Sequence, residues 1–203
     1  YRLYYEFDGT TADPGGGAKV ANPGAGIFDN VEIEIGGQRI DRQTGQWMHV
    51  WASLTEENSA RLVSGSAGTA GSANPDQLTQ GGTLFQELTA MGGTIKTSDT
   101  GDTTPLDIKV PLQFWFCRNP GLALPLIALQ YHEVKVLLTT GTRDDVMGSA
   151  WAGSTDLTVN LFVDYIYLDT DERRRFAQQS HEYLIEQVQH NNSGSSKTHD
   201  LNF

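Results

Sequence analysis

The sequence predicts an all-β protein, an antiparallel β-sandwich that carries short helices and long loops. Three observations lead to this prediction. At least six segments have the alternation or composition of strands, and only two segments have the pattern of a short helix. Strand and helix patterns do not alternate along the chain, as a parallel sheet with crossover helices would require. A chain of 203 residues is also long enough to enclose one large β core.

The clearest strand pattern is VEIEIG at residues 31–36, which follows an opening strand at residues 1–5. Its three β-branched residues lie on one face, and its two glutamates lie on the other. The Gly36-Gly37 pair permits a tight turn, because glycine adopts positive φ angles without steric cost. We therefore expect a half-buried strand, a turn and an outward continuation of the chain.

The segment DIKVPLQFWF at residues 107–116 predicts a strand with one unbroken apolar face. That face consists of Ile108, Val110, Leu112, Phe114 and Phe116. Trp115 lies on the opposite face, as does Pro111. Because proline has no N–H to donate to a neighbouring strand, Pro111 suits an edge strand or a bulge. The apolar face of this strand is expected to belong to the core.

Three further strands are predicted toward the C-terminus. Residues 132–138, HEVKVLL, alternate with their valines inward. Residues 157–168, LTVNLFVDYIYL, form the longest strand, and its second half is apolar on both faces, as expected for a strand covered on both sides. The last strand is HEYLIEQVQ at residues 181–189, and the tail from residue 190 has the composition of a linker.

Two segments predict short helices. The first runs from about residue 45 to about residue 57, with Thr44 as its N-cap. Its apolar residues recur at i, i+3, i+4 and i+7 and form the stripe Trp47, Val50, Trp51 and Leu54. We expect this stripe to pack into the core. The second helix follows Asp169, with Glu172 at its third position in a capping-box arrangement.

Residues 63–105 differ in kind, because Gly, Ser, Thr, Ala and Asp dominate them. A loop of this length in a compact domain is either functional or disordered. One apolar island, residues 84–88, interrupts the segment. We expect an exposed excursion with a short anchor in its middle. A linker between two domains is the alternative, although neither flank closes a core by itself.

Charge and cysteine content exclude several classes of function. The chain has 14 Lys and Arg against 25 Asp and Glu, a net charge of −11. This balance argues against direct nucleic-acid binding, because neutralising phosphates needs clustered basic residues. The apolar segment at 111–134 contains Arg118 and Asn119, so it is too short to span a membrane. The single Cys117 rules out an intrachain disulfide and a cysteine-built metal site.

A search for catalytic patterns finds none. The five histidines form no H-x-H or H-E-x-x-H pair, and the chain has no nucleophile elbow or P-loop. Arg118 could lower the pKa of the Cys117 thiol, but without an obvious histidine partner a buried structural thiol is favoured. We therefore expect no enzymatic activity, no catalytic residues, no metal and no cofactor. A metal site assembled across strands stays open as an alternative.

Four stretches resemble the major capsid protein of the nucleocytoplasmic large DNA viruses. They are VEIEIGGQRIDRQTGQW, VPLQFWFCRNPGLALPLIALQYHEVKV, LDTDERRRFAQQSHEYLIEQVQ and HDLNF. The resemblance covers about two thirds of the chain, and the loop composition leans slightly toward the algal-virus branch. It implies a sandwich of the jelly-roll type. Residues 1–189 would form a first jelly roll that lacks its first strand, and residues 190–203 would be the linker into a second jelly roll absent here.

The same resemblance implies a structural role. Three copies would form a homotrimeric capsomer of pseudo-hexagonal outline. Neighbouring capsomers would tile the icosahedral shell of a large double-stranded DNA virus, with an internal membrane nearby. Minor capsid and penton proteins are the other implied partners, and the virion is the implied location after assembly in the host cytoplasm. The connector after the FWF segment would pack subunits together through Arg118, Asn119, Pro120, Leu122, Leu124 and Leu126.

Three alternatives compete with this interpretation. A single-jelly-roll vertex (penton) protein would need no second barrel. A carbohydrate-binding jelly-roll module would display aromatic side chains, for which Trp115 and Tyr165 are the candidates. A cupin-like enzyme is disfavoured by the missing histidine pattern.

Overall fold

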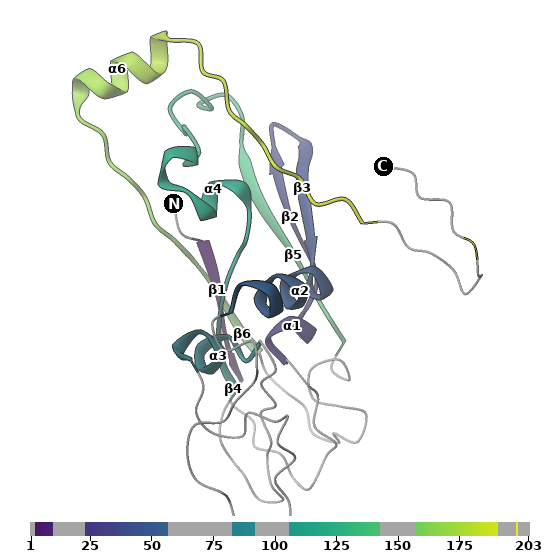
Figure 1. The fold of residues 1–203 in the computed structure, drawn as a ribbon. Helices are drawn as coiled ribbons and strands as arrows, with labels where there is room; N and C mark the ends of the chain where they lie inside the picture. The colour runs from purple at the N-terminus through teal and green to yellow at the C-terminus, as the bar shows by residue number, and fades with distance from the viewer. Residues whose placement is uncertain are drawn as a thin grey trace, which may run out of the picture.

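Two three-stranded antiparallel sheets enclose the core (Figure 1). The computed structural model describes residues 3–9, 23–56, 83–91, 106–142, 157–190 and 198. The first sheet has the order β4-β1-β6 and consists of β1 at Leu3–Gly9, β4 at Leu106–Pro111 and β6 at Leu157–Val163. The second sheet has the order β3-β2-β5 and consists of β2 at Phe28–Ile35, β3 at Gln38–Thr44 and β5 at Val134–Thr140.

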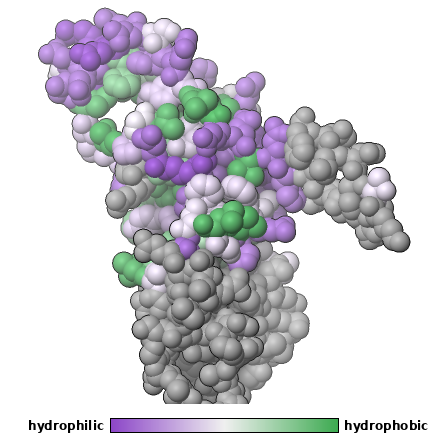
Figure 2. All heavy atoms as spheres, in the orientation of Figure 1, coloured by the Kyte–Doolittle hydropathy of each residue, from purple (hydrophilic) through white to green (hydrophobic). Residues whose placement is uncertain are grey.

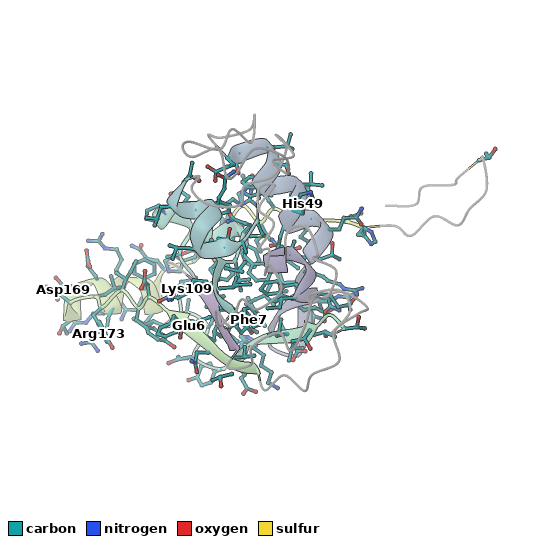
Figure 3. All side chains as sticks on the ribbon, turned by 90° about the horizontal axis from the view of Figure 1, so that it is seen from below. Glu6, Phe7, His49, Lys109, Asp169 and Arg173 are labelled. Carbon is teal, nitrogen blue, oxygen red and sulfur yellow. The ribbon has the colours of Figure 1, made fainter. Side chains whose placement is uncertain are left out.

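In the first sheet, side chains of β1 and β4 alternate between the core and the outer face. Phe7 of β1 lies opposite Ile108 of β4, and both side chains are fully buried. On the other face, Lys109 Nζ lies 3.4 Å from Glu6 Oε1, and Asn160 donates a hydrogen bond to Glu6. Figure 3 shows Phe7 on the core side of β1, with Glu6 and Lys109 on its other side. The register of the three strands therefore builds one wall of the core.

The second sheet confirms the strand and turn predicted at residues 31–37. Val31 and Ile33 are fully buried, and the chain turns through Gly36 and Gly37 at φ angles of 60° and 82°. Two successive positive φ angles match the hairpin turn that suits twisted strands. The β2–β3 pairing then shifts register, which leaves Ile40 as the extra residue of a bulge. The inward face predicted for residues 132–138 is also confirmed, because the alternate residues of β5 pack against the core.

The aromatic end of the core comes from the chain that follows β4. All five residues of the face predicted for residues 107–116 are buried, so that face is confirmed. The prediction that Trp115 lies on the opposite face is wrong, because its side chain is only 2% exposed. The strand ends at Pro111, and a helical turn, α4, spans Trp115–Arg118. Strand alternation no longer applies in this turn, and Trp115 and Phe116 both enter the core.

Helix α2, at Gly45–Thr55, begins where the sequence predicts, because Thr44 Oγ1 accepts a hydrogen bond from the N–H of Trp47. The predicted core stripe is wrong, since Val50 and Leu54 are exposed and the tryptophans are half-buried. The buried side instead carries Gly45, Met48 and Ala52. A Cβ at Gly45 would lie 2.1 Å from the carbonyl oxygen of Ala25, so only glycine permits this approach.

Two short helices lie beside α2. Helix α1 spans Pro23–Gly26, and α3 spans Leu84–Thr89 (Figure 1). The anchor predicted at residues 84–88 is confirmed as α3. It opens with a capping box between Thr83 and Gln86, and Gln86, Thr89, Ala90 and Met91 are buried. The rest of the predicted excursion, at 63–82 and 92–105, lies outside the described residues.

The C-terminal part of the chain departs most from the sequence predictions. Strand β6 ends at Val163, and the following residues are exposed, so a strand covered on both sides to residue 168 is wrong. Helix α6 spans Thr170–Gln178, and its predicted N-cap is confirmed because Asp169 accepts a hydrogen bond from the N–H of Glu172. Figure 1 shows α6 standing apart from both sheets. Residues 181–189 form no strand, and apart from Thr198 the predicted linker beyond residue 190 lies outside the described residues.

Candidate packing surface

The connector between α4 and β5 is a series of tight turns. The side chain of Asn119 accepts a hydrogen bond from the N–H of Gly121 at 2.9 Å, and Pro120 opens the 3-10 turn η1 at Pro120–Leu122. The N–H groups of Ala128 and Leu129 then donate to the carbonyl oxygen of Pro125. These local bonds satisfy backbone groups that no strand or helix pairs, so an apolar segment can remain at the surface.

The connector returns to the sandwich beside the β2–β3 turn. The N–H of Gly36 donates to the carbonyl oxygen of Glu133 at 2.9 Å. The ring of His132 lies over the same glycine, where a Cβ would approach His132 Nδ1 to 2.7 Å. The connector is therefore fixed at both ends, by α4 and by this turn.

The six residues predicted to pack subunits divide into four groups, of which Arg118 alone is the last. Leu122 and Leu124 are half-buried against the chain's own core. Asn119 and Pro120 are exposed, but both are involved in the local turn. Leu126 is the large apolar residue of the set that faces outward, with 45% of its surface exposed.

Arg118, the sixth residue, makes its contacts within the chain. Its Nη1 lies 2.9 Å from Glu186 Oε2. Its guanidinium also lies over the ring of Trp51, 5.0 Å from the centroid, in the geometry of a cation–π contact. Arg118 therefore connects α4, α2 and the segment after α6. The sequence shows each of these residues, but it does not show that they meet.

Large apolar side chains are exposed at two further places that the sequence analysis assigned to the core or did not single out. One lies on α2 and α3, where Figure 2 shows green atoms against paler and purple surroundings. Its exposed residues are Val50, Leu54, Leu84 and Leu88. The other is the chain on either side of α6, where Tyr165, Ile166 and Tyr167 precede the helix and Leu184 and Ile185 follow it. Contiguous exposed apolar surface marks sites of association, so these residues are candidates for such contacts.

Other features that could give the described residues a function are metal-ligating side chains, the cysteine thiol and membrane-spanning helices. No group of three or more metal-ligating side chains occurs among the residues that the structure describes. Burial raises the pKa of the Cys117 thiol to about 11, so the thiol stays protonated at neutral pH. The predicted structural thiol agrees with this environment. In the described part of the chain, no helix has the length and apolarity needed to cross a membrane.

Comparison with known proteins identifies the family. The family model of the major capsid protein N-terminus matches residues 5–169. The major capsid protein of Pyramimonas orientalis virus is 50% identical in an alignment of 192 residues that covers 91% of this chain and 43% of that protein. The major capsid protein of Phaeocystis pouchetii virus is 44% identical in an alignment of 188 residues that covers 82% of this chain and 35% of that protein.

Solved structures show the same likeness. PBCV-1 VP54, fitted as a crystal structure into a reconstruction of the virophage Sputnik, matches with a TM-score of 0.69 and 36% identity. The match covers 93% of this chain and 40% of that chain. A chain of a quasi-atomic model of the PBCV-1 virus capsid matches with the same TM-score, 34% identity and the same coverage. The predicted fold class, an antiparallel sandwich of the jelly-roll type with short helices, is thereby confirmed.

The resemblance drawn from the four sequence stretches is confirmed by these matches, and the matched relatives include proteins of large DNA viruses. The chain spans less than half the length of each of the relatives compared above. It belongs to the family of viral major capsid proteins and corresponds to the N-terminal part of that family.

Proposed function

We propose that this chain is the N-terminal part of a structural protein that assembles with copies of itself into the capsid shell of a large DNA virus. The observation that carries the proposal is the family match over residues 5–169, together with 50% identity to a viral major capsid protein. The likeness to a chain of the PBCV-1 capsid supports it further. The protein would reside in the virion and would act through shape and burial, with no bond made or broken.

The finer assembly follows the family resemblance. Three copies would form a capsomer of pseudo-hexagonal outline, and capsomers would contact each other, minor capsid proteins and penton proteins. Assembly would take place in the host cytoplasm, next to an internal viral membrane. Residues 1–189 would form the first of two jelly rolls, with 190–203 leading into the second. The length of the relatives supports the second domain, because the match covers only 43% of the Pyramimonas orientalis virus protein.

Subunit packing would use the outward side of the connector. Leu126 and Tyr131 project from the turns between α4 and β5, and both are exposed in the isolated chain. Burial of apolar surface contributes about 25 cal/mol per Å² of area removed from water. A contact between two different patches closes a ring when it repeats three times, so one such surface serves all three copies of a trimer. Arg118 would stabilise the position of the connector, because it holds α4 against α2 and against residues 181–190.

Two alternatives fare differently. The carbohydrate-binding module loses one of its two candidate aromatics, because Trp115 is buried in the core. The vertex protein keeps its jelly roll and is distinguished by size. Mass spectrometry of the protein from its native source should give a subunit of at least about twice the 22.2 kDa of this chain, as expected for two jelly rolls of similar size. A subunit near 22.2 kDa would instead support the vertex protein.

The surface itself is tested by a matched pair of substitutions in the full-length capsid protein. Leu126→Gln removes an apolar side chain from the connector, whereas Leu137→Gln removes one of similar exposure from the outer face of β5. We expect Leu126→Gln to weaken trimer formation by at least roughly tenfold, since truncation at the centre of an interface commonly costs more than 1 kcal/mol. Sedimentation velocity over a concentration series measures this. Equal effects of both substitutions, or none of Leu126→Gln, would remove the connector from the interface.

A further inference from the structure

The segment after α6 runs back along the free edge of β3 without forming a strand. In the described residues, β3 pairs with β2 on one side. On the other side, the Gln187 side chain donates a hydrogen bond to the carbonyl oxygen of Ile40. The N–H of Val188 donates to Asp41 Oδ1 at 3.0 Å. Side-chain groups thus replace the backbone ladder that a true neighbouring strand would form.

The contact falls on the bulge of β3. Ile40 is the extra residue of the β2–β3 pairing, and a bulge leaves backbone groups of the extra residue unpaired. The side chain of Gln187 donates a hydrogen bond to the carbonyl oxygen of Ile40, so this carbonyl is paired. Asp41 completes the junction, because its Oδ1 accepts hydrogen bonds from the N–H groups of both Arg42 and Val188. One buried carboxylate therefore bridges the strand and the returning segment.

Val188 is the half-buried residue of 186–190, so the returning segment has little apolar contact with the sandwich. Glu186, Gln187, Gln189 and His190 are exposed, and Leu184 and Ile185 face outward. A cavity of about 370 Å³ separates residues 187–190 from residues 39–42 of β3 over part of their length. Besides the two hydrogen bonds at β3, the described segment makes an ion pair between Arg118 and Glu186. A segment held by a few exposed polar contacts opens locally at low cost.

We propose that residues 186–190 form a detachable strap over the free edge of β3. The strap closes on three polar contacts: Arg118 with Glu186, the Ile40 carbonyl with Gln187, and Asp41 with the N–H of Val188. When the strap opens, the bulge of β3 presents an unpaired carbonyl and an uncovered edge, the kind of edge to which another strand can add. When it closes, the strap covers the edge without forming backbone ladder hydrogen bonds, which would otherwise have to break before the strap could open. The strap is thus a conformational device of the fold, and it shares Arg118 with the support proposed above for the connector.

Amide hydrogen exchange of the Val188 N–H tests the strap directly. The double variant Glu186→Gln/Gln187→Ala removes two of the three contacts and changes only exposed side chains. We expect the Val188 amide to exchange roughly tenfold faster or more, as the loss of about one net hydrogen bond implies. The core amides of Val31 and Ile33 should keep their exchange rates, and the thermal midpoint should stay the same.

The matched control is Glu182→Gln/Gln189→Ala, which makes the same two chemical changes on the same segment away from the three contacts. It should leave the exchange of the Val188 amide unchanged. An unaltered Val188 rate in the Glu186→Gln/Gln187→Ala variant would overturn the proposal, because the contacts would then not hold the segment. A parallel rise in exchange at Val31 and Ile33 would overturn it as well, because the segment would then be an integral part of the sandwich.

Discussion

Two apolar triplets of this chain have opposite fates. Phe114, Trp115 and Phe116 follow β4 and are buried, whereas Tyr165, Ile166 and Tyr167 follow β6 and are exposed. Both triplets come directly after strands of the same sheet. The first enters a helical turn that joins the aromatic core, with Phe114 and Phe116 stacked at 5.6 Å between centroids. The second leaves the sandwich toward α6, which has no buried residue (Figure 1).

The same contrast holds within the first sheet. Tyr5 of the central strand β1 is buried, but its partner Leu161 on β6 is 38% exposed although it lies on the same face. Strand β6 pairs with β1 alone in the described part of the chain. Edge position alone does not explain this difference, because β4 is also an edge strand and its Ile108 and Val110 are fully buried. What packs over each strand decides how much of each residue is buried. An apolar pattern therefore predicts that a strand forms more reliably than it predicts that the strand is buried.

The largest difference in stability is expected when one residue of each triplet is truncated to alanine. Phe114→Ala removes a fully buried ring, and we expect it to lower the free energy of unfolding by about 3–5 kcal/mol through lost burial and a residual cavity. Tyr167→Ala removes a ring that is 93% exposed, and we expect a change within about 0.5 kcal/mol. Chemical denaturation of both variants measures the difference. Similar losses for the two variants would mean that the second triplet is packed in solution.

The reactivity of the Cys117 thiol, next to the buried triplet, provides a second test of burial. Burial raises the pKa of Cys117 from 9.0 to about 11, with Phe114 and Arg118 nearby but unable to offset the loss of water. Below both values, the thiolate is about a hundredfold scarcer than in an ordinary exposed cysteine, because each pKa unit is a factor of ten. We expect alkylation by iodoacetamide at pH 8 to be slower by about that factor than in the urea-unfolded chain. Equal rates in both states would show that the thiol is solvated.

The features predicted well from the sequence are those that depend on near neighbours in the chain. The strand at residues 31–36, the glycine turn and the N-caps Thr44 and Asp169 all follow from patterns a few residues long. Each rests on backbone hydrogen bonds or on alternation within one element. These features do not depend on what lies across the core.

The wrong predictions concern contacts between distant parts of the chain. The apolar stripe of α2 has the right period, but Gly45 lets the opposite side of the helix approach α1 closely, and Met48 and Ala52 are buried on that side. Residues 181–189 have the composition of a strand, yet Asp41 and Gln187 supply side-chain bonds where a ladder would be needed. No local pattern shows which side of a helix is covered or which edge is free.

The candidate surface shows the same limit. The sequence selects the connector from its apolar composition, and the structure shows that Leu126 in it is exposed. The sequence does not show that Arg118 contacts Glu186 and Trp51, because these residues lie far apart in the chain. It also places the α2 stripe in the core, although part of that stripe is exposed surface. Partners of charged residues are fixed by the fold and not by spacing.

The smallest expected effect concerns Asp41, which joins β3 to the segment after α6. Burial is the main influence on this carboxyl and raises its pKa, while hydrogen bonds from Val188, Arg42 and Gln43 act in the opposite direction. Because the pKa in the folded state is higher than in the unfolded state, the folded state holds this proton more tightly. The contribution of Asp41 to stability is therefore fully present below the ordinary value of 3.8 and is lost as the pH rises through the raised pKa.

Asp41→Asn isolates that contribution, because asparagine keeps the Oδ1 acceptor for Arg42 and Val188 but cannot ionise. We expect the unfolding free energy of the wild type minus that of the variant to decrease as the pH rises above 3.8 and to level off once Asp41 is ionised in both states. At neutral pH the two proteins should differ by no more than about 1 kcal/mol, the scale of one net hydrogen bond. Urea titrations between pH 3 and pH 8 measure the difference. A difference that instead grows in favour of the wild type with rising pH would mean that the ionised carboxylate is the form the fold prefers, and that the hydrogen bonds from Val188, Arg42 and Gln43 outweigh burial at this junction.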